Sequence, residues 1–141
     1  MRPFQQPRKN AEIHTVYLID DDSSSRRGLA NLLTIAGYKV ESFKSVGGFF
    51  QIQTIDSQSC LIIDVWVQGL SIEDLRTDIL KKDAHIPMIF LSARDDKISM
   101  DKAIQANAAG FFHKPVDGSA LIDAISWEIE KQRREVGAKT R

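Results

Sequence analysis

Four aspartates stand where two apolar segments of the sequence end. The acidic run Asp20-Asp21-Asp22 directly follows the apolar residues 16–19, and Asp64 directly follows the apolar residues 61–63. Strands buried on both faces of a parallel sheet read as continuous apolar segments, and ligands bind at the carboxyl ends of such strands. Crowded carboxylates repel one another unless a cation neutralises them, and a hard divalent ion with oxygen ligands does so. The sequence therefore predicts an acidic, magnesium-type pocket shared by two strand ends.

Composition limits the kind of protein that can hold this pocket. The 141 residues suffice for one domain with a core, and 19 Lys plus Arg balance 19 Asp plus Glu. A net charge of zero gives no overall attraction to nucleic acid or to a membrane, so we expect neither as a direct partner. Cys60 is the only cysteine, no apolar run reaches the ~20 residues that span a bilayer, and residues 1–10 lack the apolar core of a signal peptide. These features predict a cytoplasmic protein.

Strand-like and helix-like patterns alternate along the chain and would position the aspartates. Short apolar or alternating runs indicate strands, and apolar residues spaced by three and four positions indicate helices. The predicted strands are 15–19, 38–41, 61–64, 88–91 and 110–113, and the predicted helices begin near 23, 46, 72, 97 and 118.

Local signals mark several helix ends. Gly37 and Gly137 are typical C-terminal stops for the first and last helices. Ser71 with Asp74 forms a capping-box-like start for the third helix. The second helix, within residues 46–54, is predicted to be short because two adjacent glycines weaken it.

The fourth helix is predicted over residues 97–108. Asp95 or Asp96 is expected to be its N-cap, and its apolar pattern consists of Ile98, Ala103 and Ile104.

Five strand–helix units with right-handed crossovers predict a single α/β domain. The expected fold is a flavodoxin-like, doubly wound, five-stranded parallel sheet of strand order 2-1-3-4-5. We expect this domain to span residues 14–135, after a flexible N-terminal arm at 1–13 and before a C-terminal tail at 136–141.

In this strand order, four strands bring their carboxyl ends to one crevice. Their terminal residues are the acidic run 20–22, Asp64, Ser92 and Lys114. A nucleophilic carboxylate, a metal-binding acid pair, a hydroxyl and an ammonium group are what a site needs to accept a phosphoryl group. The sequence therefore predicts phosphorylation of an aspartate.

Residues 16–127 resemble the receiver domain of two-component response regulators. The resemblance rests on four motifs in the same order and at the same strand ends: Ile19-Asp20-Asp21-Asp22, Ile62-Ile63-Asp64 with Gly69 after it, Leu91-Ser92-Ala93, and His113-Lys114-Pro115.

The resemblance implies a Mg²⁺ site in the acidic pocket. Asp64 would be the phosphoacceptor and would also contact the metal. Asp21 would be a direct metal ligand, Asp20 a second one acting directly or through water, and the backbone carbonyl of Trp66 would complete the shell. Asp22, by contrast, is read as the N-cap of the first helix.

The resemblance also implies the groups that hold the phosphoryl oxygens. Ser92 would donate its hydroxyl, the backbone N–H of Ala93 would assist, and Lys114 would pair with the phosphate. Phe111 matches the switch aromatic of the family, and the bond before Pro115 is expected to be cis.

In the loop that follows the acceptor, two residues depart from the family pattern. Gln68 stands where receivers usually have proline, which removes a φ restraint from this loop. Trp66 is unusually large, and two readings stay open: its indole slows loss of the phosphoryl group, or it packs across the mouth of the site.

The predicted function is a phosphoryl-accepting signalling switch. The donor would be a phosphohistidine of a histidine kinase or phosphotransfer protein, with Mg²⁺ as cofactor. The chain would not be an enzyme, apart from catalysing its own phosphorylation and dephosphorylation. Phosphorylation would change the face of the fourth helix, fifth strand and fifth helix, where we expect a phosphorylation-dependent homodimer.

Two alternatives from other classes compete with this reading. A phosphoaspartate-type hydrolase would want an acid at position 66, where the chain has Trp66. A flavodoxin-like flavin-binding module would want a glycine- and hydroxyl-rich loop after the first strand, where the chain has three carboxylates. Whether the chain is a stand-alone receiver or part of a longer, DNA-binding regulator stays open.

Overall fold

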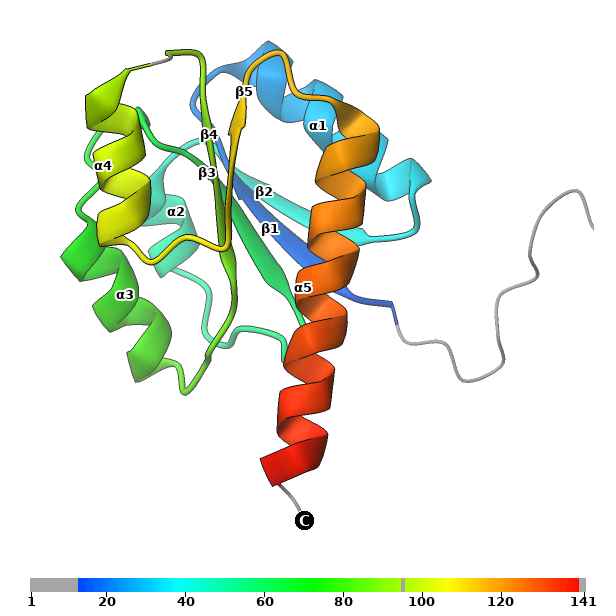
Figure 1. Cartoon of the computed structure of the whole chain (residues 1–141). Coiled ribbons are helices and arrows are strands. Elements are labelled where there is room, and N and C mark those ends of the chain that lie inside the picture. Colours follow the sequence, from blue (N-terminus) through cyan, green and yellow to red (C-terminus); the bar gives the residue numbers. More distant parts are fainter. Residues whose placement is uncertain (1–12, 95, 140–141) are drawn as a thin grey trace, which may run out of the picture.

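A five-stranded parallel sheet lies between two layers of helices (Figure 1). The computed structural model describes residues 13–94 and 96–139. The strand order is β2-β1-β3-β4-β5, so the predicted fold and order are confirmed. The elements are β1 Thr15–Ile19, α1 Ser23–Ile35, β2 Lys39–Phe43, α2 Val46–Phe50, β3 Cys60–Asp64, α3 Ile72–Lys81, β4 Met88–Ser92, α4 Lys97–Gln105, β5 Gly110–His113 and α5 Gly118–Lys139. The arm expected at 1–13 lies almost wholly outside the described residues, as does Asp95.

The strands β1, β3 and β4 are buried on both faces, and their alternate residues separate two hydrophobic clusters. On the side of α1 and α5 the cluster includes Val16, Leu18, Ile62, Leu91, Leu33 and Ile125. On the side of α2, α3 and α4 it includes Tyr17, Ile19, Ile63, Phe90, Phe49 and Leu75. Because side chains alternate along a strand, continuous apolar runs supply both clusters at once. Because both faces of each strand are packed, its position along the sheet is fixed. The position of the residue that follows the strand is therefore fixed as well.

The predicted N-caps of α1 and α3 and the predicted stop of α1 are present in the structure. Asp22 Oδ1 accepts hydrogen bonds from the backbone N–H groups of Ser24 at 2.9 Å and Ser25 at 3.2 Å, so its reading as an N-cap is confirmed. Ser71 Oγ accepts from the N–H of Asp74 at 3.2 Å at the start of α3. Gly37 follows α1 with a φ of +105°, a conformation that a residue without Cβ adopts readily.

Helix α4 differs from its prediction. It ends at Gln105 rather than near residue 108, and the side chains of Ile98 and Ile104 are 57% and 69% exposed. Its buried residues are Ser99 and Ala103, which lie four positions apart on one face. Both are small, so the buried face of α4 is a narrow stripe, and the larger residues Ile98 and Ile104 remain exposed.

Helix α5 continues past Gly137, the predicted stop, to Lys139. A glycine inside a helix costs about 1 kcal/mol relative to alanine, which a long helix tolerates. Helix α2 ends at Phe50, before the expected limit at residue 54. Among the described residues, no helix combines the length and apolar character needed to cross a membrane.

Candidate functional site

Four neighbouring strand ends bring the predicted site residues together. Asp20 follows β1, Asp64 and Ser92 are the last residues of β3 and β4, and Lys114 follows β5. The parallel register pairs Asp64 with Leu91, and the backbone N–H of Lys114 donates to the carbonyl of Ser92 at 2.9 Å. The site therefore lies at the carboxyl edge of the sheet, as the sequence predicted.

Lys114 joins the two buried carboxylates of this edge. Its Nζ lies 2.7 Å from Asp20 Oδ2 and 2.7 Å from Asp64 Oδ2. Burial by itself would lower the pKa of Lys114, but the hydrogen bonds and negative charges of the two aspartates outweigh it and raise the pKa above its ordinary value. The lysine therefore carries a positive charge between the two acids at neutral pH.

The remaining carboxylate oxygens are oriented by the backbone of the following loops. Asp20 Oδ1 accepts from the N–H of Asp22 at 3.0 Å, and Asp64 Oδ1 accepts from the N–H of Trp66 at 2.7 Å. Arg26 Nη1 donates to the carbonyl oxygen of Asp20 at 2.7 Å, which ties α1 to the end of β1. These contacts hold both carboxylates in fixed directions, with each acid facing Lys114.

The donor chemistry of this edge fits a hard divalent cation. Carboxylate and backbone carbonyl oxygens are the ligands that Mg²⁺ takes, and the side-chain oxygens of Asp20 and Asp64 retain lone pairs beside their hydrogen bonds. Asp21 is exposed at the mouth of the site. Within residues 13–94 and 96–139, no three acidic, histidine or cysteine side chains converge closely enough to hold a metal ion as they stand. Lys114 is the cation that neutralises the acids in this arrangement.

Ser92 is fully buried, and its hydroxyl points toward the loop that leads to α4. Its Oγ donates to the carbonyl of Arg94 at 2.9 Å and accepts from the N–H of Arg94 at 2.9 Å. It also contacts Ser99 Oγ, on α4, at 3.1 Å. Ala93 is exposed directly after it. The expected phosphoryl-binding hydroxyl is therefore engaged with α4 and its loop.

Trp66 extends from the loop after β3 to α4. Its Nε1 donates to Ser99 Oγ at 2.7 Å. Two cations lie over its ring, with Arg94 Cζ 4.0 Å and Lys102 Nζ 4.4 Å from the ring centroid. Sequence reasoning did not identify Ser99, Arg94 or Lys102 as neighbours of the site, because no spacing along the chain relates them to Trp66.

The two phenylalanines of β5 pack on opposite sides of the sheet. Both are half-buried: Phe111 packs against the cluster under α2, α3 and α4, and Phe112 against the cluster under α1 and α5. Phe111 also makes an edge contact with the ring of His113, with centroids 5.6 Å apart. The Lys114–Pro115 bond is cis, as expected.

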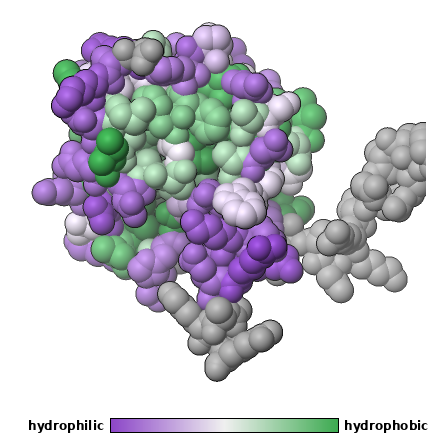
Figure 2. Space-filling model, viewed as in Figure 1, coloured by the Kyte–Doolittle hydropathy of each residue, from purple (hydrophilic) through white to green (hydrophobic). Residues whose placement is uncertain are grey.

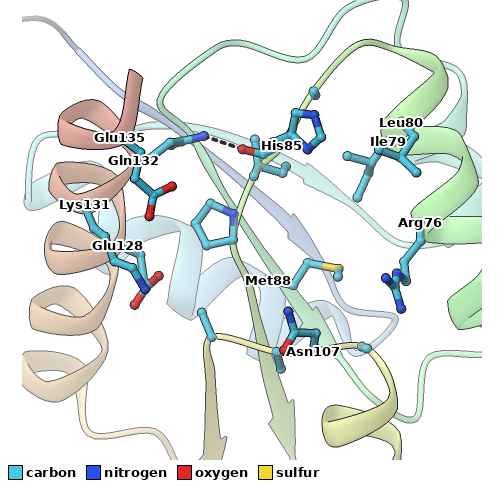
Figure 3. Close-up of a pocket in the computed structure, with 16 residues that line it drawn as sticks. Arg76, Ile79, Leu80, His85, Met88, Asn107, Glu128, Lys131, Gln132 and Glu135 are labelled. Atoms are coloured by element: carbon cyan, nitrogen blue, oxygen red, sulfur yellow. Dashed lines mark hydrogen bonds between the residues drawn. The ribbon is translucent and has the colours of Figure 1, made fainter. Parts of the chain in front are cut away.

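A cavity lies at the opposite end of β4 from the acidic site. It has a volume of about 480 Å³, and its lining includes Met88 at the start of β4, Arg76 from α3 and Glu128 from α5 (Figure 3). Gln132 Nε2 closes one side by donating to the carbonyl of His85 at 2.7 Å. Since Ser92 ends the same strand that Met88 begins, this cavity is separate from the site at the carboxyl edge.

Comparison with known sequences assigns the chain to a family. The model of the response regulator receiver domain matches residues 16–126. Nodulation protein W of Bradyrhizobium diazoefficiens is 35% identical over 122 residues, which are 85% of this chain and 54% of that protein. The response regulator protein TodT of Pseudomonas putida is 34% identical over 110 residues, 78% of this chain and 48% of that protein. The chain thus spans about half the length of these relatives.

Solved structures agree with this assignment. The response regulator StyR superposes with a TM-score of 0.77 at 32% identity, covering 92% of this chain and 65% of that chain. FixJ-N superposes with a TM-score of 0.73 at 26% identity, covering 85% of this chain and 96% of that chain. Sequence, fold and the acidic carboxyl edge lead to one conclusion: the chain belongs to the response regulator receiver domain family of two-component signalling.

Proposed function

We propose that this chain is a phosphoryl-accepting signalling switch in which Asp64 receives the phosphoryl group. The observation that carries the proposal is the lysine bridge, in which Lys114 Nζ lies 2.7 Å from both Asp20 and Asp64. Asp64 is the acid of this pair that ends a central strand and retains some exposure, whereas Asp20 is completely buried. An incoming phosphoryl group therefore reaches Asp64 first.

The donor is a phosphohistidine of a histidine kinase or phosphotransfer protein in the cytoplasm. An oxygen of Asp64 attacks the phosphorus, the bond between phosphorus and the imidazole nitrogen breaks, and the imidazole recovers its electron pair and takes up a proton. Lys114 offsets the negative charge of the transferring oxygens. Ser92 and the N–H of Ala93 supply hydrogen-bond donors next to the acceptor.

Asp20, Asp21, Asp64 and the carbonyl of Trp66 are the groups that would hold Mg²⁺. Asp21 is exposed and directly follows Asp20, and in this proposal its carboxylate joins the other acids around the ion. A bound Mg²⁺ would screen the acids from the incoming phosphoryl group and stabilise its charge.

The output surface in this proposal is formed by α4, β5 and α5. Figure 2 shows hydrophobic residues gathered over this region, and α4 adds the exposed side chains of Met100 and Ile104, four positions apart. Phosphorylation draws Ser92 toward Asp64 and repositions Phe111 beneath this surface, which promotes a homodimer. The chain itself makes no direct contact with nucleic acid. Light scattering with and without a beryllofluoride phosphoryl mimic tests the dimer, which an unchanged mass would contradict.

The phosphoacceptor assignment has a direct test in the labelling stoichiometry. Acetyl phosphate with Mg²⁺ should add one phosphoryl group to the protein, and EDTA should prevent it. Asp64→Asn should abolish the mass increase. Asp22→Asn is the matched control, because it removes a carboxylate from the same edge while asparagine caps a helix as well as aspartate does. Labelling that persists in Asp64→Asn, or disappears in Asp22→Asn, would contradict the assignment.

A further inference from the structure

Trp66, Ser99, Ser92 and Arg94 form a closed ring of contacts, which we call the indole latch. Trp66 Nε1 donates to Ser99 Oγ at 2.7 Å, Ser99 Oγ contacts Ser92 Oγ at 3.1 Å, and Ser92 Oγ donates to the carbonyl of Arg94 at 2.9 Å. The guanidinium of Arg94 then lies over the Trp66 ring at 4.0 Å. The ring connects the loop after β3, the end of β4 and the first turn of α4.

The chemistry of the end groups fixes the direction of the two outer hydrogen bonds of the latch. The indole nitrogen of Trp66 can only donate, and the carbonyl of Arg94 can only accept. In the arrangement in which Ser92 gives its single proton to that carbonyl, Ser99 is the donor between the two hydroxyls. Ser92 Oγ therefore donates once and accepts twice, from Ser99 and from the N–H of Arg94 at 2.9 Å. Its hydrogen-bonding capacity is fully used.

Burial makes this arrangement costly to break. Ser92 and Ser99 are both completely buried, so water does not replace a lost partner. Hydrogen bonds in a directed chain also polarise and strengthen one another in a low-dielectric environment. Ser99 is further held by its own backbone N–H, which donates to the cap residue Asp96 at 2.9 Å.

We propose that Trp66 is a positioning residue that, through Ser99, holds the Ser92 hydroxyl in its resting direction. This inference rests on the proposed function, in which Ser92 donates its proton to the phosphoryl group. To do so, Ser92 must withdraw that proton from the carbonyl of Arg94 and turn away from Ser99. The indole latch therefore opposes activation, and its release frees the first turn of α4.

The same geometry explains how the acceptor loop and α4 are coupled. The backbone N–H of Trp66 donates to Asp64 Oδ1 at 2.7 Å, while its side chain is bonded to α4. A change at Asp64 thus acts on the residue whose ring anchors α4. Lys102, which lies 4.4 Å from the same ring, adds a second contact from α4.

The test measures the affinity for beryllofluoride in the presence of Mg²⁺, by ¹⁹F NMR of the bound fluoride. Ser99→Ala removes the donor to Ser92 and should raise the affinity about fivefold, which corresponds to one hydrogen bond of typical net strength. Trp66→Phe keeps an aromatic ring but lacks the N–H, and it should raise the affinity about two- to threefold. Ser126→Ala and Trp127→Phe, which change the same residue types outside the latch, should leave it unchanged.

A double-mutant cycle separates the latch from other roles of the indole. If Trp66 acts through Ser99, then Trp66→Phe should have no further effect on affinity in the Ser99→Ala background. Wild-type affinity in both variants, or an equal effect of Trp66→Phe in either background, would overturn the inference, because a ring that only shields or packs does not depend on Ser99. If the wild-type protein binds no beryllofluoride, the proposed function fails as well.

Discussion

Replacing Lys114 by Met should destabilise the protein, because it removes the positive charge at the carboxyl edge of the sheet. The substitution keeps an unbranched side chain of similar length but removes the ammonium group between Asp20 and Asp64. The side chains of Lys114, Asp20 and Asp64 are 15%, 0% and 12% exposed, so solvent does little to screen the two acids that remain. Removing one partner of a buried ion pair costs about 3–5 kcal/mol, and we expect a loss of this size at pH 7.

The loss of stability in Lys114→Met should be smaller at low pH than at high pH. Two facing carboxylates lower their repulsion when one takes up a proton, so the folded variant binds a proton that the unfolded chain, with an ordinary Asp pKa of about 3.9, has released. Stability of the variant should therefore rise as the pH falls from 8 to 5. Lys114 of the wild-type protein adds no slope here, because its pKa is raised above 10.5.

Urea unfolding from pH 5 to pH 8 in EDTA provides the assay. Lys97→Met is the matched control, since the Lys97 ammonium also pairs with an aspartate, at 3.2 Å from Asp101, but is 88% exposed. An exposed pair contributes little, so this variant should stay within about 0.5 kcal/mol of wild type at every pH. If Lys114→Met costs no more than Lys97→Met, or its cost is the same at pH 5 and pH 8, the reasoning about the lysine bridge is wrong.

Three further predictions concern the fold that supports the site. Asp22→Ala should lower the free energy of unfolding by about 1 kcal/mol through the lost cap of α1, while Asp22→Asn should not; equal losses in urea unfolding would contradict the cap. Phe49→Ala should cost about 3–5 kcal/mol, because Phe49 is completely buried and packs edge-on against Tyr17, and a loss below 1 kcal/mol would refute this packing. Burial raises the pKa of Tyr17 above 10.0, so the unfolded chain loses that proton first and stability should fall as the pH rises above 10. In Tyr17→Phe this loss of stability above pH 10 should be smaller, and an unchanged pH dependence would contradict the prediction.

The sequence predicted most of the fold because its strongest signals are of the kind that tertiary structure preserves. Runs such as 16–19 and 61–63 are apolar on both sides, which commits them to the centre of a parallel sheet. Right-handed crossovers limit the possible strand orders, and the order found brings Asp20, Asp64 and Lys114 to one edge. Lys114 is 94 positions from Asp20 and 50 positions from Asp64 in the sequence, and the sequence alone predicts that the three residues meet.

What the sequence did not predict depends on contacts between elements without a periodic signal. Trp66 and Ser99 are 33 positions apart, and a serine on an exposed helix is ordinarily read as a surface residue. The same is true of α4 as a whole: Ile98 and Ile104 suggest a buried stripe, yet the small residues Ser99 and Ala103 form the contact face. A contact face of small residues leaves almost no hydrophobic pattern to detect.

The central claim is that Asp64, and not another acid of the carboxyl edge, accepts the phosphoryl group. Borohydride reduces an acyl phosphate to an alcohol, so treating the phosphorylated protein with it converts the modified aspartate to homoserine, which peptide mass spectrometry locates. Our account predicts homoserine at position 64 alone, in an amount that follows the phosphorylated fraction and disappears with EDTA. Homoserine at position 20, 21 or 22, with Asp64 intact, would contradict it.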